Sequence, residues 1–171
     1  MKVELIAATA DQEPILANLL ELYCHDFSEI TALHLNSSGR FGYAPLPLYW
    51  QESGRYPFLV KVNNNLSGFV LVKKGSEISG DQDVWDIAEF FIVRGYRRHG
   101  IGMRAAHDVW KKFPGYWEIR VLPENQGGEA FWKRAIASFM GFTIEAGVVE
   151  STGKISHVFS FDTALAKTSA G

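Results

Sequence analysis

One acidic residue, Glu89, interrupts an otherwise apolar run from Ile87 to Val93. In a regular strand it would share a face with Trp85, Ile87 and Phe91, because strand side chains alternate between the two faces. Desolvation on such a face raises the pKa of a carboxylic acid toward a value useful for proton transfer. Burying an unpaired acid is also costly, which favours a functional residue over an ordinary strand glutamate. Glu89 is therefore our first candidate for a general base.

A second carboxylate, Glu118, precedes the expected strand from Ile119 to Leu122. The expected fold places it across from the glycine-rich turn described next. We keep it as the second candidate for a catalytic base, although an exposed acid at the end of a strand is the simpler interpretation.

A basic turn with three glycines, Arg94 to Gly102, separates the apolar run from a helical pattern. The first N–H groups of a helix lack partners, and the helix dipole places partial positive charge there. Arg97, Arg98 and His99 add side-chain donors, while Gly100 and Gly102 allow a ligand to approach the backbone. A strand, such a turn and a helix start together predict a binding site for pyrophosphate.

Two other phosphate-binding motifs resemble this turn in part. Gly100 to Ala105 fits the dinucleotide fingerprint G-x-G-x-x-G/A, with Glu118 as a possible ribose-binding acid. In that fold, however, the glycines follow the strand almost directly, and repeated strand–helix units are needed. Here the residues 94–99 intervene, and only two clear helices follow residue 60. A P-loop is excluded because no Gly-Lys-Ser/Thr sequence follows the turn.

The turn resembles the signature of the GNAT superfamily of N-acyltransferases, Gln/Arg-x-x-Gly-x-Gly/Ala, which appears as Arg97 to Gly102. A second segment, PENQGGEAFWKRAIASFMGF, resembles the family's Asn-x-x-Ala-x-x-Phe-Tyr…Gly-Phe pattern. The usual tyrosine of that pattern falls on Trp132, whose indole N–H cannot supply a proton as a phenol can. The resemblance implies acetyl-CoA as co-substrate, with these binding residues: Phe91, Ile92, Val93, Arg97, Arg98, His99, Gly100, Ile101, Gly102, Met103, Asn125 and Trp132.

The resemblance also implies direct attack of an amine on the thioester in a ternary complex, without an acyl-enzyme. An amine with a pKa of about 10 arrives protonated at neutral pH, so a group must accept its proton. The thioester oxygen becomes negative and needs N–H donors, which a strand bulge near Phe91 and Ile92 would supply. A CoA-binding or sensory module that has lost catalysis is the rival interpretation, which Trp132 permits. The acceptor remains open: a small molecule or a peptide amine.

The expected fold is a single α/β (α+β) domain over residues 1–165, followed by a frayed tail at 166–171. Its mixed, mostly antiparallel twisted sheet has six to seven strands flanked by helices, and the family implies a splayed parallel strand pair at the cofactor site. Asp11 is the expected N-cap of the first helix. The segment 31–57 is expected to be a long irregular loop rich in aromatic residues. In the family it forms a wall of the acceptor pocket, but its aromatics would also serve to cover the core.

Composition and charge narrow the class of protein further. The net charge is −2 and 47% of the residues are hydrophobic, which fits a soluble globule and gives no indication of nucleic-acid binding. No stretch has the length of a membrane span or a signal peptide, so a cytoplasmic protein is expected. His, Cys and Asp show no metal-ligand spacing, and Cys24 is expected to pack. The oligomeric state, monomer or homodimer, is left open.

Charge is unevenly distributed along the chain. Residues 94–112 carry six basic residues and one acidic residue, a balance of +5, and residues 1–60 carry three basic and seven acidic residues, a balance of −4. The basic stretch suits a phosphate-bearing cofactor. The acidic stretch would attract a cationic amine, although a run of charge is also typical of a solvated surface.

Overall fold

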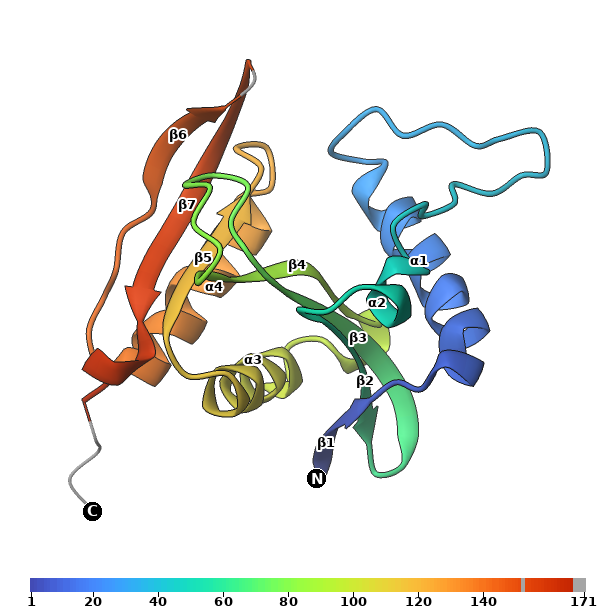
Figure 1. The fold of residues 1–171 in the computed structure, drawn as a ribbon. Coiled ribbons are helices and arrows are strands. Elements are labelled where there is room, and N and C mark those ends of the chain that lie inside the picture. Colours follow the sequence, from blue (N-terminus) through green and yellow to red (C-terminus); the bar gives the residue numbers. More distant parts are fainter. Residues whose placement is uncertain (152, 168–171) are drawn as a thin grey trace. The chain divides into compact units, whose positions relative to one another are not determined.

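The computed structural model describes residues 1–151 and 153–167, and it contains one seven-stranded sheet in the order β1-β2-β3-β4-β5-β7-β6 (Figure 1). The strands are β1 (Val3–Ala7), β2 (Arg55–Val62), β3 (Asn65–Lys74), β4 (Trp85–Ile92), β5 (Tyr116–Val121), β6 (Gly147–Ser151) and β7 (Lys154–Asp162). The helices are α1 (Glu13–Phe27), α2 (Leu48–Gln51), α3 (Ile101–Lys112) and α4 (Gln126–Met140). The expected mixed sheet with one parallel pair, β4 and β5, is confirmed.

The chain forms two compact units, which we describe separately. The first comprises Met1–Val72 and Glu89–Ile101, and the second comprises Lys73–Ala88 and Gly102–Gly171. Both β3 and β4 therefore begin in one unit and end in the other. No helix in the described part of the chain is long and apolar enough to span a membrane.

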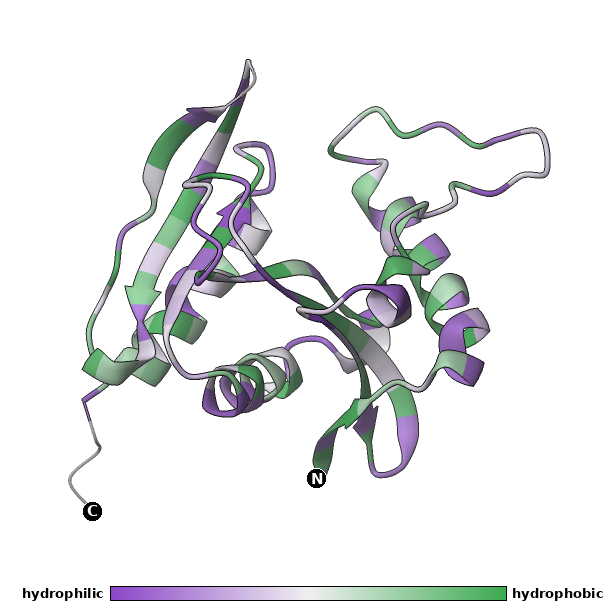
Figure 2. Cartoon of the chain, in the orientation of Figure 1, coloured by the Kyte–Doolittle hydropathy of each residue, from purple (hydrophilic) through white to green (hydrophobic). Residues whose placement is uncertain are grey.

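In the first unit β1 and β2 pair antiparallel, from Val3 opposite Val62 to Ala7 opposite Phe58. The hydrophobic residues in the middle of β2 and β3 are almost fully buried, and Figure 2 shows this apolar character along β2. The expectation that Asp11 caps the first helix is wrong. Asp11 lies inside a short 3-10 turn, and the side chains of Thr9 and Gln12 form the capping box that precedes α1.

The segment between α1 and β2 was expected to be irregular throughout, and this is partly wrong because it contains the short helix α2. Glu21 of α1 anchors the loop before α2 by accepting hydrogen bonds from the backbone N–H groups of Phe41 and Gly42, both at 2.9 Å. Tyr49 of α2 is only 3% exposed, and the Trp50 indole N–H donates to Ala8 O at 3.0 Å. These two aromatic residues thus cover the edge of the core.

In the second unit β5, β7 and β6 pair antiparallel, and the parallel register joins Trp85 to Trp117 and Asp86 to Glu118. Trp110 of α3 is fully buried and packs edge-on against Phe139 of α4 and Phe161 of β7, each with ring centroids 5.2 Å apart. Figure 2 shows hydrophobic and hydrophilic residues alternating along α3, as the amphipathic pattern predicts.

The two ends of α4 follow from the local sequence. Asn125 Oδ1 accepts a hydrogen bond from Gly128 N at 2.9 Å and so caps the helix start. Gly141, with φ of 77°, ends the helix in the left-handed conformation that glycine adopts readily. Beyond the expected end of the domain at residue 165, Lys167 N donates to Met140 O at 2.9 Å. Residues 168–171 of the expected tail lie outside the described residues.

Candidate active site

The turn after β4 is an exposed loop that leads directly into α3. Arg98 and Gly100 both adopt positive φ, 66° and 75°. Positive φ is uncommon for a residue with a side chain, so the backbone conformation of Arg98 must be fixed by its surroundings. Arg98, His99 and Gly100 are exposed, and a Cβ built on Gly100 would meet nothing within 4 Å. The loop therefore leaves room for a ligand beside the start of α3, where the helix favours an anion.

The side chain of Arg97 points back onto the protein. Its Nε donates to Ile92 O at 2.7 Å, its guanidinium lies 5.5 Å from the centre of the Phe91 ring, and it forms an ion pair with Asp26. Arg94 pairs with the same carboxylate at 2.7 Å. The guanidinium of Arg97 thus ties the turn to the end of β4 and to α1.

Asp26 is the partner that the sequence analysis missed. It lies in the last turn of α1, and nothing in its local sequence connects it with a turn some 70 residues away. Burial raises the pKa of its carboxyl, but the hydrogen bonds and charges of Arg97 and Arg94 outweigh this and hold the pKa below its usual value. Asp26 is therefore ionised at neutral pH.

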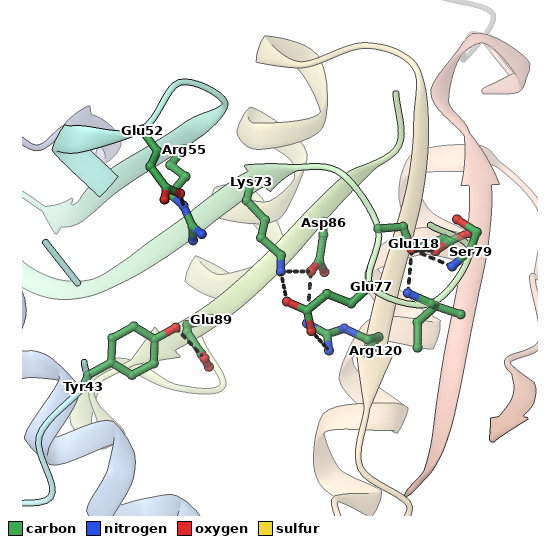
Figure 3. A network of polar contacts seen from close by, with 12 residues as sticks. Tyr43, Glu52, Arg55, Lys73, Glu77, Ser79, Asp86, Glu89, Glu118 and Arg120 are labelled. Carbon is green, nitrogen blue, oxygen red and sulfur yellow. Dashed lines mark hydrogen bonds and ion pairs between the residues drawn. The ribbon is translucent and has the colours of Figure 1, made fainter. Parts of the chain in front are cut away.

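Glu89, the first candidate base, is half-buried between two tyrosines of the first unit. The Tyr43 hydroxyl donates to Glu89 Oε1 at 3.0 Å (Figure 3), and Tyr23 of α1 lies near enough for the charge of the carboxylate to act on its hydroxyl. Burial, with the nearby charge of Glu89, raises the pKa of both tyrosines far above the usual value, so both phenols stay protonated. The Tyr43 hydroxyl thus holds one oxygen of the Glu89 carboxylate in place, and the carboxylate is a group that can accept a proton or bind an ammonium ion.

The end of β4 lies unusually close to β3. A Cβ built on Gly68 would lie 2.1 Å from Phe91 O and 3.1 Å from Ile92 Cα, so only glycine fits there. Val93 N donates to Ser67 O at 2.9 Å just beyond this point. Gly68 therefore fixes the path of the strand segment that was expected to bind the thioester. The bulge at Phe91 and Ile92 stays a prediction.

The expectation that Glu118 is an exposed acid at the end of a strand is wrong. It lies inside β5, is only 7% exposed, and forms a hydrogen bond with the Ser76 hydroxyl in the second unit. The same hydroxyl oxygen accepts from the backbone N–H groups of Ile78 and Ser79, both at 3.0 Å (Figure 3). These contacts give Glu118 a structural task, which is to hold the loop between β3 and β4.

A buried ionic cluster lies beside Glu118 in the second unit and was not foreseen from the sequence. Asp86 is 2% exposed, and its Oδ2 accepts from Arg120 Nη2 at 3.1 Å, with Lys73 Nζ at 3.8 Å. Glu77 bridges the two cations from the exposed side (Figure 3). Burial raises the pKa of Asp86, although Arg120 and Lys73 oppose the shift.

Two residues of the second segment that resembles the family, Asn125 and Trp132, lie in the second unit. Asn125 uses its side-chain oxygen to cap α4, which leaves its amide nitrogen as a donor. Trp132 is 7% exposed, and its ring lies 6.3 Å from Trp110 and 4.9 Å from Phe131. Trp132 is therefore part of the aromatic core around α3 and α4.

The remaining candidates carry no chemistry in this structure. Cys24 is buried, as expected, and burial raises the pKa of its thiol. His107 is half-buried and bonds to Ala135 O at 3.0 Å. Among residues 1–151 and 153–167 we find no group of three or more His, Cys, Asp or Glu side chains suited to a metal ion.

Known proteins share this fold over nearly their whole length. Similar structures include an acetyltransferase from Thermus thermophilus (TM-score 0.69, 16% identity, 95% of this chain and 97% of that chain). Others are the aminoglycoside acetyltransferase AAC(6')-Ib in complex with coenzyme A (0.72, 13%, 96% and 96%) and the ribosomal-protein-S18-alanine N-acetyltransferase from Escherichia coli (0.62, 11%, 99% and 99%). At these identities the likeness shows the fold alone.

Sequence comparison gives the family. No curated protein sequence matches significantly. The model of the acetyltransferase (GNAT) family, however, matches residues 16–136. Because this match covers well over half of the sequence and includes the glycine turn, the chain belongs to the GNAT family of acetyltransferases.

Proposed function

We propose that this protein transfers an acetyl group from acetyl-CoA to an amine of a small molecule or a peptide. The observation that carries the proposal is the exposed loop Arg98–Gly100, which has open space over Gly100 and leads into the start of α3. Backbone N–H groups of this loop and of the first turn of α3 would hold the pyrophosphate. Membership of the GNAT family and the CoA complex of a protein with this fold support the choice of ligand.

In this proposal the strand end at Phe91, Ile92 and Val93 binds the pantetheine and acetyl end of acetyl-CoA. The contact of Asn125 with the cofactor, which the family resemblance implies, stays a prediction. Bound acetyl-CoA supplies the activated thioester. Glu89 accepts the proton of the attacking ammonium, directly or through water, and Tyr43 holds its carboxylate in place. The amine nitrogen then bonds to the thioester carbon, and the CoA thiolate leaves with the electrons of the broken C–S bond. The nitrogen loses its second proton as the amide forms, and this proton passes to the thiolate, directly or through water, to give the free thiol.

Glu118 does not share this role in our proposal. Its carboxylate is already engaged by Ser76 and is largely withdrawn from solvent. The acidic balance of residues 1–60 supports a cationic acceptor, because a negative surface attracts amines before they bind.

A second function, a CoA-binding module without catalysis, is favoured by one observation. The position of the family's tyrosine holds Trp132, which is packed in an aromatic core and whose indole N–H cannot supply a proton as a phenol can. The two functions differ in turnover and agree in CoA binding.

Thermal unfolding with and without acetyl-CoA tests the shared part of the proposal. A ligand that binds only the folded state raises Tm by mass action. We expect such a shift, and we expect Gly102→Asp to abolish it, because a carboxylate would then lie at the start of α3 beside the phosphates. A full shift in Gly102→Asp would overturn the assignment of the loop. Release of free thiol with a panel of amines then separates the enzyme from the module without catalysis.

A further inference from the structure

The last turns of α1 contact two parts of the candidate site. Tyr23 lies beside Glu89, whose charge helps to raise the pKa of the tyrosine, and Asp26, three residues further along the same helix, pairs with Arg94 and Arg97 of the cofactor turn. Residues three apart lie on the same side of a helix. One face at the end of α1 therefore holds both the candidate base and the turn that would bind pyrophosphate.

The Phe91 side chain joins these two contacts. Its ring lies 6.1 Å from the ring of Tyr23 on one side and 5.5 Å from the guanidinium of Arg97 on another. The same guanidinium donates to the carbonyl of Ile92 at 2.7 Å. Arg97 is thus fixed by a carboxylate, a carbonyl and an aromatic ring, all within the first unit.

We propose that Asp26 is a positioning residue for acetyl-CoA: its carboxylate holds Arg97 and Arg94 so that the loop Arg98–Gly100 has its binding conformation before the cofactor arrives. This inference rests on the proposed function, because it concerns the same loop. The left-handed conformation of Arg98 is unfavourable on its own and needs such external support. A loop that is ordered in advance does not lose entropy when the ligand binds, which increases affinity.

A simpler role for Asp26 predicts the opposite sign. If Asp26 were only a negative charge near an anionic ligand, or a competitor of phosphate for the arginines, its removal would tighten CoA binding. If Asp26 positions the loop, its removal weakens CoA binding although an unfavourable charge has been removed. The sign of the change in affinity therefore separates the two roles without reference to its size.

The decisive experiment measures the Kd of CoA by isothermal titration calorimetry for the unmodified protein, Asp26→Asn and Asp26→Glu. An amide can accept from one arginine, but its NH2 group faces the other, so Asp26→Asn should weaken binding about tenfold or more. Asp26→Glu restores the charge and should recover most of the affinity. In turnover, Asp26→Asn should raise KM for acetyl-CoA and leave kcat within about twofold, because the reacting groups are untouched.

Glu21→Gln is the matched control. It removes one negative charge from the same helix, and Glu21 binds the backbone of Phe41 and Gly42 rather than the cofactor turn. We expect it to leave the Kd of CoA unchanged. Arg97→Lys is a second test if Asp26→Asn fails to fold. Lysine keeps the charge but cannot bond to Asp26 and Ile92 O together, so CoA binding should again weaken.

Each result has a distinct meaning. Equal or tighter CoA binding by Asp26→Asn, or unchanged binding by Arg97→Lys, would overturn the positioning role alone. An equal loss in Glu21→Gln would also overturn it, because the effect would then be one of general charge. If the unmodified protein did not bind CoA at all, the proposed function itself would fail, and this inference with it.

Discussion

β3 and β4 approach each other so closely at Gly68 that the effect of adding a single Cβ atom there can be predicted from a distance. In Gly68→Ala the new Cβ would lie 2.1 Å from Phe91 O, whereas Cβ contacts below 3.0 Å are essentially never seen. The strands must therefore separate by at least 0.9 Å, the difference between these two values. The obstructing atoms belong to the backbone, so rotation of a side chain cannot relieve the clash.

The expected effects of Gly68→Ala concern both stability and cofactor binding. Overpacking of this kind costs about 1–3 kcal/mol, and each kcal/mol lowers Tm by roughly 2–4 °C in a domain of this size. The shift also displaces Phe91 and Ile92, the strand end that we propose binds the acetyl group. A misplacement of about 1 Å near the reacting atoms can reduce turnover by about 100-fold. We therefore expect a lower Tm and a larger loss of kcat/KM.

Gly127→Ala is the matched control, because it makes the same chemical change where the added Cβ meets nothing within 4 Å. Gly127 lies in the first turn of α4, where alanine should stabilise the helix by about 0.5–1 kcal/mol. Differential scanning calorimetry and steady-state kinetics on both variants provide the comparison. If Gly68→Ala kept the Tm and the kcat/KM of the unmodified protein, our description of β4 at the site would be wrong.

Four further predictions follow from the site and the ionic contacts. Glu89→Gln should lower kcat at neutral pH with little change in CoA affinity, and the deficit should shrink at high pH, where the free amine is abundant; an unchanged pH–rate profile would exclude Glu89 as the base. Trp132→Phe should leave kcat nearly unchanged if the indole only packs against Trp110 and Phe131. If the variant folds and binds CoA but is inactive, the indole N–H has a catalytic or positioning role. Arg120→Met should lower the free energy of unfolding by about 3–5 kcal/mol in urea titrations, because it leaves Asp86 buried with Lys73 alone; a loss below about 1 kcal/mol would contradict the buried pairing. The pKa of Asp26 is lowered in the folded state. Its stabilising contribution is therefore present above the unfolded pKa of about 4 and is lost as the pH falls through the folded value. Asp26→Asn should accordingly flatten the acid side of the profile of stability against pH, and a profile identical to that of the unmodified protein would contradict the ion pairs.

The sequence predicted most of the fold because its periodic patterns are local. The strand around Glu89, the basic turn after it and the helix that follows the turn all appear where the residues indicated them. The 3-10 turn before α1 and the helix α2 were missed. Each is only three or four residues long, so neither shows a full helical period.

The side-chain contacts within the site could be predicted from the sequence much less well than the fold. Glu89 was identified because it is the one charge in an apolar run, but its partner Tyr43 is 46 residues away along the chain. Asp26 and Arg97 are 71 residues apart. Glu118 was misjudged because a carboxylate beside an apolar run looks exposed until its buried partner, Ser76, is known. Such pairings depend on the tertiary structure, which local periodicity does not encode.

The most direct test of the proposed activity is transfer itself. The unmodified protein would be incubated with acetyl-CoA and a panel comprising a polyamine, an aminoglycoside, free amino acids and a peptide with N-terminal alanine, and the products would be analysed by mass spectrometry. We expect an N-acetylated product from at least one amine, formed together with an equal amount of free CoA, and a strongly reduced rate in Glu89→Gln. Tight binding of acetyl-CoA without acetylation of any amine in the panel would contradict the enzymatic assignment and favour the CoA-binding module.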